Sequence, residues 1–305
     1  MAPPIKVLVC DHVELEHLTL GAAFQIDNKP GISRDELLRI APGYDVLVIR
    51  SRTKVDREVL DKSTSLKVVA RPGTGLDNVD VEYAKSRGVE VINSPESLVE
   101  AVAEHVTLLM LALSRKLTLA DQSVKAGRWE KEALMGRELK GKVMGIVGLG
   151  RIGRRIAAIA NVLGMSVLAY DVIPIPRDVV DELHCKIVGL DEVFSSSDYI
   201  TLHVPMTQDT RRMVDSRRLA SMKRSAFIIN TSRGGVIDEA ALVDALRNGV
   251  IAGAALDVFE KEPPGGPILS APNIIVTPHV GGQTAEAQVS AITVVGDKLR
   301  EFFSR

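Results

Sequence analysis

The sequence has few of the residues that mark specialised protein classes. It contains two cysteines, Cys10 and Cys185, and one tryptophan in 305 residues, and aromatic residues make up only 4%. Two thiols form at most one bridge, which excludes a disulfide scaffold and fits a reducing compartment, so we expect a cytoplasmic protein. The opening Met-Ala-Pro-Pro lacks a charged segment followed by an apolar one, so no secretion signal is expected.

The sequence also lacks an excess of one charge and a long apolar run. Lys plus Arg number 38 and Asp plus Glu number 39, which gives a net charge of −1 and no general attraction to nucleic acid or an anionic membrane. The richest apolar stretch, Leu98–Leu113, is interrupted by polar residues, whereas a membrane span needs about 20 mostly apolar residues. This stretch predicts a buried helix that begins with a capping box of Ser97 and Glu100. We expect neither nucleic acid nor a membrane as a partner.

Short apolar runs alternate with helix-like segments over nearly the whole chain. Helices are expected at Arg151–Leu163 and Glu239–Asn248, followed by Gly164 and Gly249, which suit the position just after a helix. The runs are apolar on both faces, as buried strands of a parallel sheet are. They are Ile5–Cys10, Asp45–Ile49, Leu66–Ala70, Val89–Ile92, Val143–Val147, Ser166–Tyr170, Lys186–Val188, Tyr199–Val204, Ala226–Asn230, Gly253–Val258 and Asn273–Thr277. This alternation predicts a doubly wound α/β fold.

Two such units lie on either side of the long helix expected at Ser97–Lys116. The length suits two domains at roughly 150 residues each, and we place the first at about residues 1–97 and the second at about residues 98–283. The last segment, Thr284–Phe303, is expected to be a closing helix. Periodicity alone does not say which domain it joins.

A glycine-rich turn follows the expected strand Val143–Val147. Gly148, Gly150 and Gly153 match G-x-G-x-x-G, in which glycines allow a tight turn, close approach of a pyrophosphate and close helix packing. The helix after it would direct its free amides at the phosphates, and Arg151 suits the pyrophosphate. Asp171 ends the next strand at 171 − 150 = 21 residues further on, near the spacing of about 20 expected for a ribose-binding acid. The sequence therefore predicts a dinucleotide site that prefers NAD to NADP.

Polar residues follow the later strands of the second domain, where ligands of open α/β sheets bind. They include Arg233, Asp257, Glu262 and His279. Oxidation of a hydroxy acid needs a base for the hydroxyl proton, which a histidine oriented by a carboxylate supplies, and an arginine to bind carboxylate or carbonyl oxygen. His203 also ends a strand but has no evident partner, and we interpret it as structural.

The order of these residues makes the chain resemble the D-isomer-specific 2-hydroxyacid dehydrogenases over essentially its full length. The most specific stretches are Asn230–Gly235, Ala255–Pro263 and Thr277–Gly282. The resemblance implies two Rossmann-like doubly wound domains with a cleft between them. It also implies that Arg233 binds substrate, that Glu262 and His279 transfer the proton together, and that Asp257 contacts the nicotinamide.

The resemblance further implies which domain does what. Residues 1–97 with 284–305 would form the substrate-binding domain, to which the closing helix returns, and residues 98–283 the NAD-binding Rossmann domain. Family members are usually homodimers joined through the coenzyme domain, and the long helix after Ser97 is similar to their dimer element. Many members that act on 3-phosphoglycerate carry a C-terminal serine-binding domain. The chain stops just after the closing helix, so we expect no such domain and a short form of the enzyme.

Within the family, the likeness is strongest to the branch that oxidises D-3-phosphoglycerate, the first step of serine biosynthesis. It rests on Ile49–Val55, Arg71–Asp80 and Gly127–Lys131 with Met135 and Gly136. Arg50, Arg52, Lys54 and Arg71 follow two strands and would form a cationic pocket for a phosphate, while the backbone amides of residues 73–75 would bind the substrate carboxylate.

Together these arguments give one set of candidate residues and leave alternatives open. The catalytic candidates are Arg233, Glu262 and His279; the NAD candidates are Thr74, Gly148, Gly150, Arg151, Ile152, Gly153, Asp171, Val204, Thr231, Ser232, Arg233, Asp257, His279, Gly281 and Gly282; the substrate candidates are Arg50, Ser51, Arg71, Gly73, Thr74, Gly75, Arg233 and His279. No metal site is expected. The alternatives are a glyoxylate or hydroxypyruvate reductase, a D-lactate type enzyme, and a dinucleotide-binding corepressor.

Overall fold

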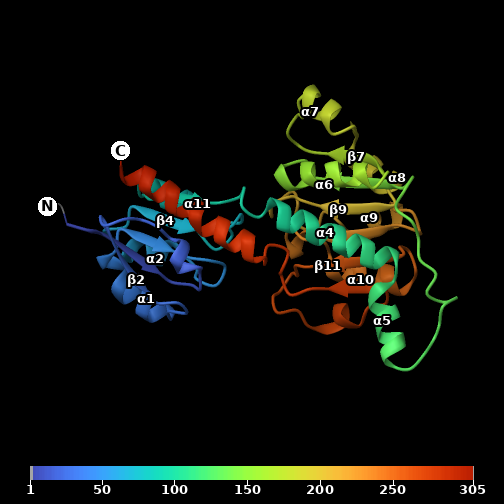
Figure 1. Ribbon diagram of the computed structural model, residues 1–305, viewed down its shortest axis with the longest axis horizontal. Coiled ribbons are helices and arrows are strands. Elements are labelled where there is room, and N and C mark those ends of the chain that lie inside the picture. Colours follow the sequence, from blue (N-terminus) through green and yellow to red (C-terminus); the bar gives the residue numbers. More distant parts are fainter. Residues whose placement is uncertain (1–2, 305) are drawn as a thin grey trace. The chain divides into compact units, whose positions relative to one another are not determined.

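The computed structural model describes residues 3–304. Met1, Ala2 and Arg305, which belong to the predicted first domain, lie outside the described residues, and so does the start of the segment judged to carry no secretion signal. The chain divides into two compact units, residues 1–99 with 282–305 and residues 100–281. Both contain a parallel sheet with helices (Figure 1), so the predicted doubly wound α/β class is confirmed.

The first unit is built on a five-stranded sheet in the order β2-β1-β3-β4-β5. Its strands are β1 (Ile5–Val9), β2 (Phe24–Asn28), β3 (Val46–Val48), β4 (Val68–Arg71) and β5 (Glu90–Asn93). Its helices are α1 (Arg34–Ile40), α2 (Arg57–Lys62), α3 (Val81–Ser86) and α11 (Ala285–Phe303), with short 3-10 turns η1 (Leu15–His17) and η2 (Ala41–Gly43).

Alternation of side chains along the strands gives this unit a core on each face of the sheet. Leu8 of β1 packs in the cluster that contains residues of α1, α2 and α3, whereas Val7 and Val9 pack in the cluster that contains residues of α11. The closing helix begins at Ala285 after an N-cap by Thr284 and covers the second face, which would otherwise be exposed apolar surface.

The second unit is built on a seven-stranded sheet in the order β12-β11-β10-β9-β6-β7-β8. Chain order reverses between β6 and β9, which makes the carboxyl ends of these two strands the switch point where ligands of such sheets bind. The strands are β6 (Val143–Val147), β7 (Ser166–Tyr170), β8 (Cys185–Ile187), β9 (Tyr199–Leu202), β10 (Phe227–Asn230), β11 (Gly253–Leu256) and β12 (Ile274–Val276).

Helices connect these strands, and several of them supply the core. Phe194, Leu219 and Leu242 pack in one cluster with buried strand residues such as Ile200. The helices are α4 (Val99–Ser114), α5 (Leu117–Lys125), α6 (Arg151–Val162), α7 (Arg177–Glu182), α8 (Leu190–Ser196), α9 (Ser216–Ser221) and α10 (Glu239–Arg247), with 3-10 turns η3 (Gly234–Val236) and η4 (Gly266–Ser270).

The long apolar helix is confirmed, but its predicted ends are wrong. It begins at Val99 and ends at Ser114, and Lys116 in a left-handed conformation (φ 51°) separates it from α5. The predicted capping box does not form: Glu100 accepts a hydrogen bond from Arg155 Nε at 2.7 Å, and the buried Ser97 hydroxyl has no partner among residues 3–304. Within that range, no helix is long and apolar enough to cross a membrane.

One strand, β2, does not follow from the sequence pattern, and the reason is its position at the sheet edge. β2 (Phe24–Asn28) pairs with β1 alone, and its residues are half-buried or exposed, so polar Gln25 and Asp27 break the apolar pattern. The other strands fall within about two residues of their predicted bounds, as is usual for element ends. Gly164 and Gly249 have φ of 73° and 61°, as expected for residues after helices.

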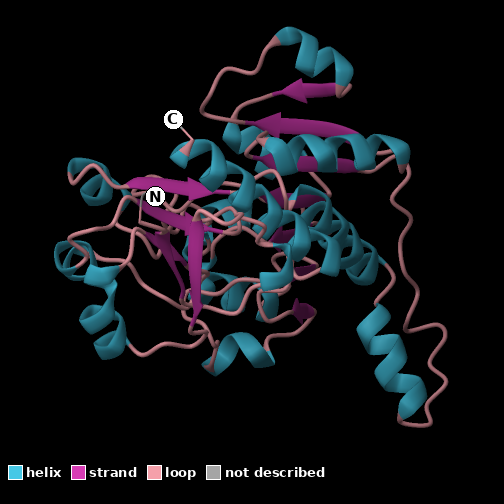
Figure 2. Cartoon of the chain, turned by 60° about the vertical axis from the view of Figure 1, so that its left-hand side comes forward, coloured by secondary structure: helices cyan, strands magenta, loops and turns pink. Residues whose placement is uncertain are grey.

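A segment of the second unit extends away from its sheet. We call residues 117–137 the arm: α5 followed by a chain without strands (Figures 1 and 2). Its large apolar side chains are exposed, at 53% for Leu117, 56% for Val124, 84% for Trp129 and 76% for Met135. Exposed apolar residues gathered on one projecting element are typical of a contact surface.

Candidate active site

Two of the three glycines in the turn after β6 are required because the surrounding atoms leave no room for a side chain. A Cβ on Gly148, which has φ 97°, would lie 2.4 Å from the His203 carbonyl oxygen, and one on Gly153 would lie 2.2 Å from the Gly148 carbonyl oxygen. A Cβ on Gly150 would meet nothing within 4 Å. The middle glycine therefore faces open space, where a phosphate can approach the backbone.

The helix after this turn begins without a side-chain cap. Gly150 is its N-cap, and Arg151 and Ile152 are its first residues, so their amides have no partner within the helix. Such amides, together with the positive end of the helix dipole, bind anions. Arg151 is exposed beside them.

Asp171 lies at the end of β7 and is tied to the glycine turn. Its carboxylate accepts hydrogen bonds from the Leu149 amide at 2.7 Å and the Ile173 amide at 3.0 Å. A carboxylate has about four acceptor positions, so two remain for ribose hydroxyls. Asp171 thus stabilises the turn and can also accept hydrogen bonds from the ribose hydroxyls. Val204, which follows β9, lies against the other side of the turn, since its Cγ1 would be 3.2 Å from a Cβ on Gly148.

The buried Asn230 at the end of β10 shapes the turn that carries Thr231, Ser232 and Arg233. Asn230 Oδ1 accepts hydrogen bonds from the Ser232 amide (3.0 Å) and hydroxyl (2.8 Å), and its Nδ2 donates to the Arg233 carbonyl at 2.8 Å. Gly234 is required because a Cβ would lie 1.8 Å from the Phe259 carbonyl carbon. Sequence reasoning quoted Asn230 within a motif but did not recognise its role.

Thr231 supplies a test of the predicted coenzyme. Its hydroxyl is buried and has no hydrogen-bond partner among residues 3–304. A buried hydroxyl left unpaired is costly, so a polar ligand group is expected beside it. Together with the open face of Gly150 and the uncapped start of α6, this feature fits a dinucleotide.

Glu262 and His279 form a direct pair. His279 Nδ1 lies 2.9 Å from Glu262 Oε2, and Glu262 Oε1 accepts a hydrogen bond from the Phe259 amide at 3.2 Å. The pair is accessible, with 49% of the histidine side chain and 41% of the glutamate side chain exposed. Because the carboxylate accepts at Nδ1, that nitrogen carries the proton, and Nε2 is the atom that remains to exchange a proton with a substrate.

Asp257 is only 1% exposed, and its carbonyl oxygen accepts a hydrogen bond from the His279 amide at 2.9 Å. Its carboxylate accepts hydrogen bonds from the amides of Val280 and Gly281 at 2.9 and 2.8 Å. Burial by itself raises the pKa of Asp257, but the hydrogen bonds from His105, Thr277 and these two amides outweigh burial and hold the pKa below its ordinary value. Asp257 is therefore a stable anion in the described site.

The first unit carries the predicted substrate residues after neighbouring strands. Asp11, which follows β1, is buried and accepts hydrogen bonds from the amides of Arg50 (2.6 Å) and Thr53 (3.1 Å). Asn78 Nδ2 donates to the Arg50 carbonyl at 2.6 Å, and Arg71 Nε donates to Asn78 Oδ1 at 3.1 Å. Asn78 therefore holds the Arg50 backbone and the Arg71 side chain together, and neither Asp11 nor Asn78 was recognised from sequence.

Arg50 is a half-buried cation. Among residues 3–304, its hydrogen bonds are made by its backbone, and its guanidinium forms no ion pair. Burial lowers the pKa of Arg50, while the nearby carboxylates of Asp11 and Glu14 act in the opposite direction. Ser51 beside it is exposed, and Arg52 donates to the Gly31 carbonyl at 3.0 Å. Arg52 is thus already engaged, whereas the Arg50 guanidinium can take an anion.

The glycine-rich loop after β4 differs in one respect from its prediction. The Gly73 amide donates to Ser94 Oγ at 2.8 Å, so it is occupied. Within residues 3–304, the amides of Thr74 and Gly75 donate to no acceptor of the protein. These two amides, rather than three, are the donors that remain for a carboxylate. Gly282, predicted to bind the coenzyme, lies in the same unit, where a Cβ would be 3.2 Å from Leu98 Cδ1.

His203 is held as a structural residue would be. Its Nε2 lies 2.8 Å from Thr201 Oγ1, and burial lowers the pKa of His203 to about 3. It therefore stays neutral at neutral pH.

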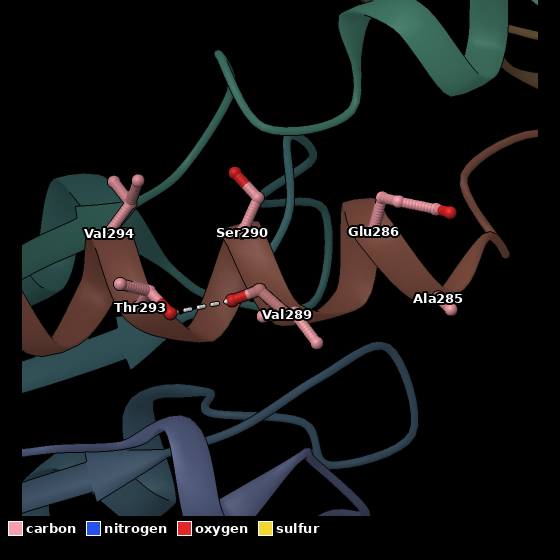
Figure 3. A pocket seen from close by; sticks show the side chains of 6 residues that line it. All are labelled: Ala285, Glu286, Val289, Ser290, Thr293 and Val294. Atoms are coloured by element: carbon pink, nitrogen blue, oxygen red, sulfur yellow. Dashed lines mark hydrogen bonds between the residues drawn. The ribbon is translucent and has the colours of Figure 1, made fainter.

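A separate hollow of about 530 Å³ runs along α11 and contains none of the predicted residues (Figure 3). It is lined by Ala285, Glu286, Val289, Ser290, Thr293 and Val294.

Comparison with known proteins places these features in context. Residues 107–281 match the family model described as D-isomer specific 2-hydroxyacid dehydrogenase, NAD binding domain. The chain is 45% identical over 261 residues to a hydroxypyruvate reductase of Thermotoga maritima, covering 84% of each protein. It is 43% identical over 298 residues to a D-3-phosphoglycerate dehydrogenase of Synechocystis sp., covering 97% of the chain but 54% of that protein.

The chain thus spans about half the length of the curated phosphoglycerate dehydrogenases it matches. Among solved structures, it resembles a D-lactate dehydrogenase from Aquifex aeolicus in complex with NAD and lactic acid. The TM-score is 0.86 and the identity 29%, and the match covers 98% of this chain and 95% of that one. The match to the NAD-binding domain family and the likeness to this NAD-bound structure both support NAD as the coenzyme.

Proposed function

Because this chain belongs to the D-isomer-specific 2-hydroxyacid dehydrogenases, whose NAD-binding domain it contains, we propose that it oxidises D-3-phosphoglycerate to 3-phosphohydroxypyruvate. This reaction is the first step of serine biosynthesis. The proposal is supported by similarity, over 97% of this chain, to a relative named D-3-phosphoglycerate dehydrogenase. The observation that carries it is the half-buried Arg50, whose hydrogen bonds among residues 3–304 are made by its backbone, so that its guanidinium can bind a phosphate.

The residues divide the chemistry between them. NAD, when bound at the glycine turn, would supply the acceptor for the hydride that leaves the substrate carbon. His279 Nε2 takes the hydroxyl proton, while Glu262 accepts at Nδ1 and so fixes the ring orientation and stabilises the imidazolium that forms. Arg233, placed by Asn230, binds the carboxylate or the developing carbonyl oxygen. Asp171 accepts from the ribose hydroxyls and repels a 2′-phosphate, which favours NAD.

The phosphate is assigned to Arg50 and Arg71. Arg50 is half-buried and its guanidinium forms no ion pair within residues 3–304, so a ligand that carries negative charge would form strong, charge-assisted hydrogen bonds with it. Asn78 holds Arg71 beside it. The Thr74 and Gly75 amides would then bind the substrate carboxylate. The single-carboxylate substrates of other family members need fewer cations.

A second candidate is reduction of hydroxypyruvate or glyoxylate. It is favoured by the Thermotoga maritima relative, which matches along 84% of both chains and is named a hydroxypyruvate reductase. The two candidates share the coenzyme turn, Arg233, Glu262 and His279. The two candidates differ in whether Arg50 and Arg71 bind a phosphate group of the substrate.

A substrate panel separates the candidates. NADH formation is measured with 3-phosphoglycerate, glycerate, D-lactate and glycolate, and NADH consumption with 3-phosphohydroxypyruvate, hydroxypyruvate and glyoxylate. We expect the highest kcat/KM for the phosphorylated pair. Arg50→Ala should raise KM for the phosphorylated substrates alone, and Arg39→Ala, an exposed arginine of α1, should change neither. Equal losses on both classes in Arg50→Ala would reject the phosphate assignment.

We also propose that the protein is a homodimer joined through the arm and the exposed side of α4. Leu108 and Leu111 of α4 are 53% and 41% exposed, and they continue the apolar series of the arm. A second copy of this chain offers the same apolar face, as a two-fold interface requires.

We propose that the protein works in the cytoplasm. Both cysteines are buried and free, which is consistent with that reducing compartment.

A further inference from the structure

α4 buries one ionisable side chain among apolar ones. His105 is 12% exposed, and its neighbours Val102, Val106 and Leu109 on the same helix are buried. Its Nε2 lies 3.1 Å from Thr277 Oγ1 and 3.5 Å from Asp257 Oδ1. The contact with Thr277 links residues 172 positions apart in the chain, and all three residues lie within the second unit.

The chemistry of the three groups fixes the direction of their hydrogen bonds. Thr277 Oγ1 lies 2.5 Å from Asp257 Oδ1, and an ionised carboxylate only accepts, so the hydroxyl proton points to Asp257. Thr277 Oγ1 must then accept from its other neighbour, His105 Nε2. The geometry therefore assigns a proton to His105 Nε2 and a relay from His105 through Thr277 to Asp257.

Asp257 in turn holds the backbone that carries the catalytic histidine. Its carbonyl oxygen accepts from the His279 amide at 2.9 Å, and its carboxylate accepts from the amides of Val280 and Gly281. His279 itself has φ 55°, a region that non-glycine residues occupy only when their surroundings hold them there. Three successive amides on one aspartate supply that restraint.

The fit around Asp257 is close. A Cβ on Gly281 would lie 3.0 Å from Asp257 Oδ2 and 3.7 Å from His105 Cδ2. Rotation of the carboxylate would therefore break its hydrogen bonds to the amides of Val280 and Gly281 and bring it into steric conflict with its neighbours. The orientation of this carboxylate depends on the two side-chain groups that contact Oδ1, Thr277 and His105.

We propose that His105 is a positioning residue for proton transfer: through Thr277 it orients Asp257, which holds residues 279–281 so that the His279 ring stays directed at the substrate hydroxyl. The inference rests on the proposed role of His279 as the base. His105 itself touches neither the substrate nor the coenzyme in this scheme. It makes a helix outside the predicted motifs part of the catalytic apparatus.

The experiment compares four variants. His105→Leu removes the donor, His105→Gln keeps an N–H donor near the Nε2 position, Thr277→Val breaks the relay while His105 stays, and Glu104→Gln changes an exposed neighbour on the same helix. Each is measured for kcat, KM, NAD affinity and thermal stability. Amide hydrogen exchange at Val280 and Gly281 is followed by NMR.

We expect His105→Leu and Thr277→Val to lower kcat about 10- to 100-fold, the loss that small misplacement of a catalytic group causes, with KM for the hydroxy acid and NAD affinity nearly unchanged. Exchange at Val280 and Gly281 should accelerate. His105→Gln should recover most of kcat, and Glu104→Gln should match the wild type.

Two results would overturn the proposal. One is unchanged exchange and kcat in both His105→Leu and Thr277→Val. The other is an equal loss in His105→Leu and His105→Gln accompanied by equal loss of stability, which would make His105 only a packing residue. If the wild type oxidises no hydroxy acid, the proposed function fails, and the exchange measurements still decide whether His105 holds the 279–281 backbone.

Discussion

At the scale of single residues, His279 is the group on which turnover should depend most. His279→Ala removes the base, so kcat should fall about 10²-fold or more, the usual contribution of general base catalysis. Glu262→Gln keeps an oxygen that accepts from Nδ1, which lies 2.9 Å from Glu262, but loses the negative charge, so kcat should fall less. Steady-state kinetics with separate NAD titrations test both, and near-normal turnover in His279→Ala would place the base elsewhere.

His203 should make stability depend on pH. In the unfolded chain its imidazole takes a proton near the ordinary value of about 6.5, whereas burial lowers the folded pKa to about 3. Between these values the unfolded state binds more protons, so the free energy of unfolding should decrease as pH falls from 6.5 toward 3, by at most about 1.4 kcal/mol per pH unit.

The measurement is urea unfolding of the wild type and His203→Gln between pH 7.5 and about 4. The advantage of the wild type over the variant should shrink as the pH is lowered. Curves that stay parallel over this range would show that His203 does not remain neutral in the folded protein.

Site residues were predictable where their role depends on local sequence. Gly148, Gly150 and Asp171 lie in one strand-turn-helix-strand unit, so spacing alone assigns them. Asn78 and His105 act through side chains that reach residues 28 and 172 positions away, and no periodicity records such contacts. Gly73 was assigned an amide that Ser94, 21 residues later, already occupies, for the same reason.

At the scale of elements, the three glycines of the turn after β6 should respond differently to a methyl group. Gly148→Ala and Gly153→Ala place Cβ 2.4 and 2.2 Å from carbonyl oxygens, so each should lower stability by about 1–3 kcal/mol or more, the cost of overpacking. Gly150→Ala meets no atom within 4 Å and should fold normally but bind NAD weakly. Thermal unfolding and NAD titration separate the two effects, and normal NAD affinity in Gly150→Ala would argue against pyrophosphate binding there.

Element ends and edges were predicted less well than element centres. β2 at the sheet edge has one neighbour and keeps polar side chains, so its alternation is weak. Lys116 interrupts a segment that reads as one continuous helix, because its left-handed conformation is disfavoured locally by about 1–2 kcal/mol and is held by surrounding contacts such as the bond from Lys116 Nζ to the Ala133 carbonyl. Neither feature follows from propensity.

At the scale of the whole molecule, the fold class was accessible because parallel strands buried on both faces give continuous apolar runs. Val46–Val48 and Tyr199–Leu202 are buried at every position. Strand order was not accessible from such runs, since all of them look alike. The reversal between β6 and β9, which creates the ligand edge, emerges only when the sheet is assembled.

The arm exposes several large apolar side chains to solvent, and the proposed dimer would bury them. Trp129 is 84% exposed, and burial of such a side chain removes a large apolar area from water. Trp129→Glu places a charge where the proposed dimer buries its surface, so we expect it to shift the protein to monomers. Val162→Glu, an 88% exposed valine at the end of α6, is the matched control and should keep the wild-type mass.

Light scattering after size-exclusion chromatography, run at several protein concentrations, measures the outcome. A dimer whose subunits stabilise each other should also show a Tm that rises with protein concentration, and Trp129→Glu should lose that dependence. A wild type that is monomeric throughout, or a Trp129→Glu protein that stays dimeric, would remove the arm from the interface. In the second case another exposed surface must join the subunits, and the apolar residues of α4 would be tested next by Leu108→Glu.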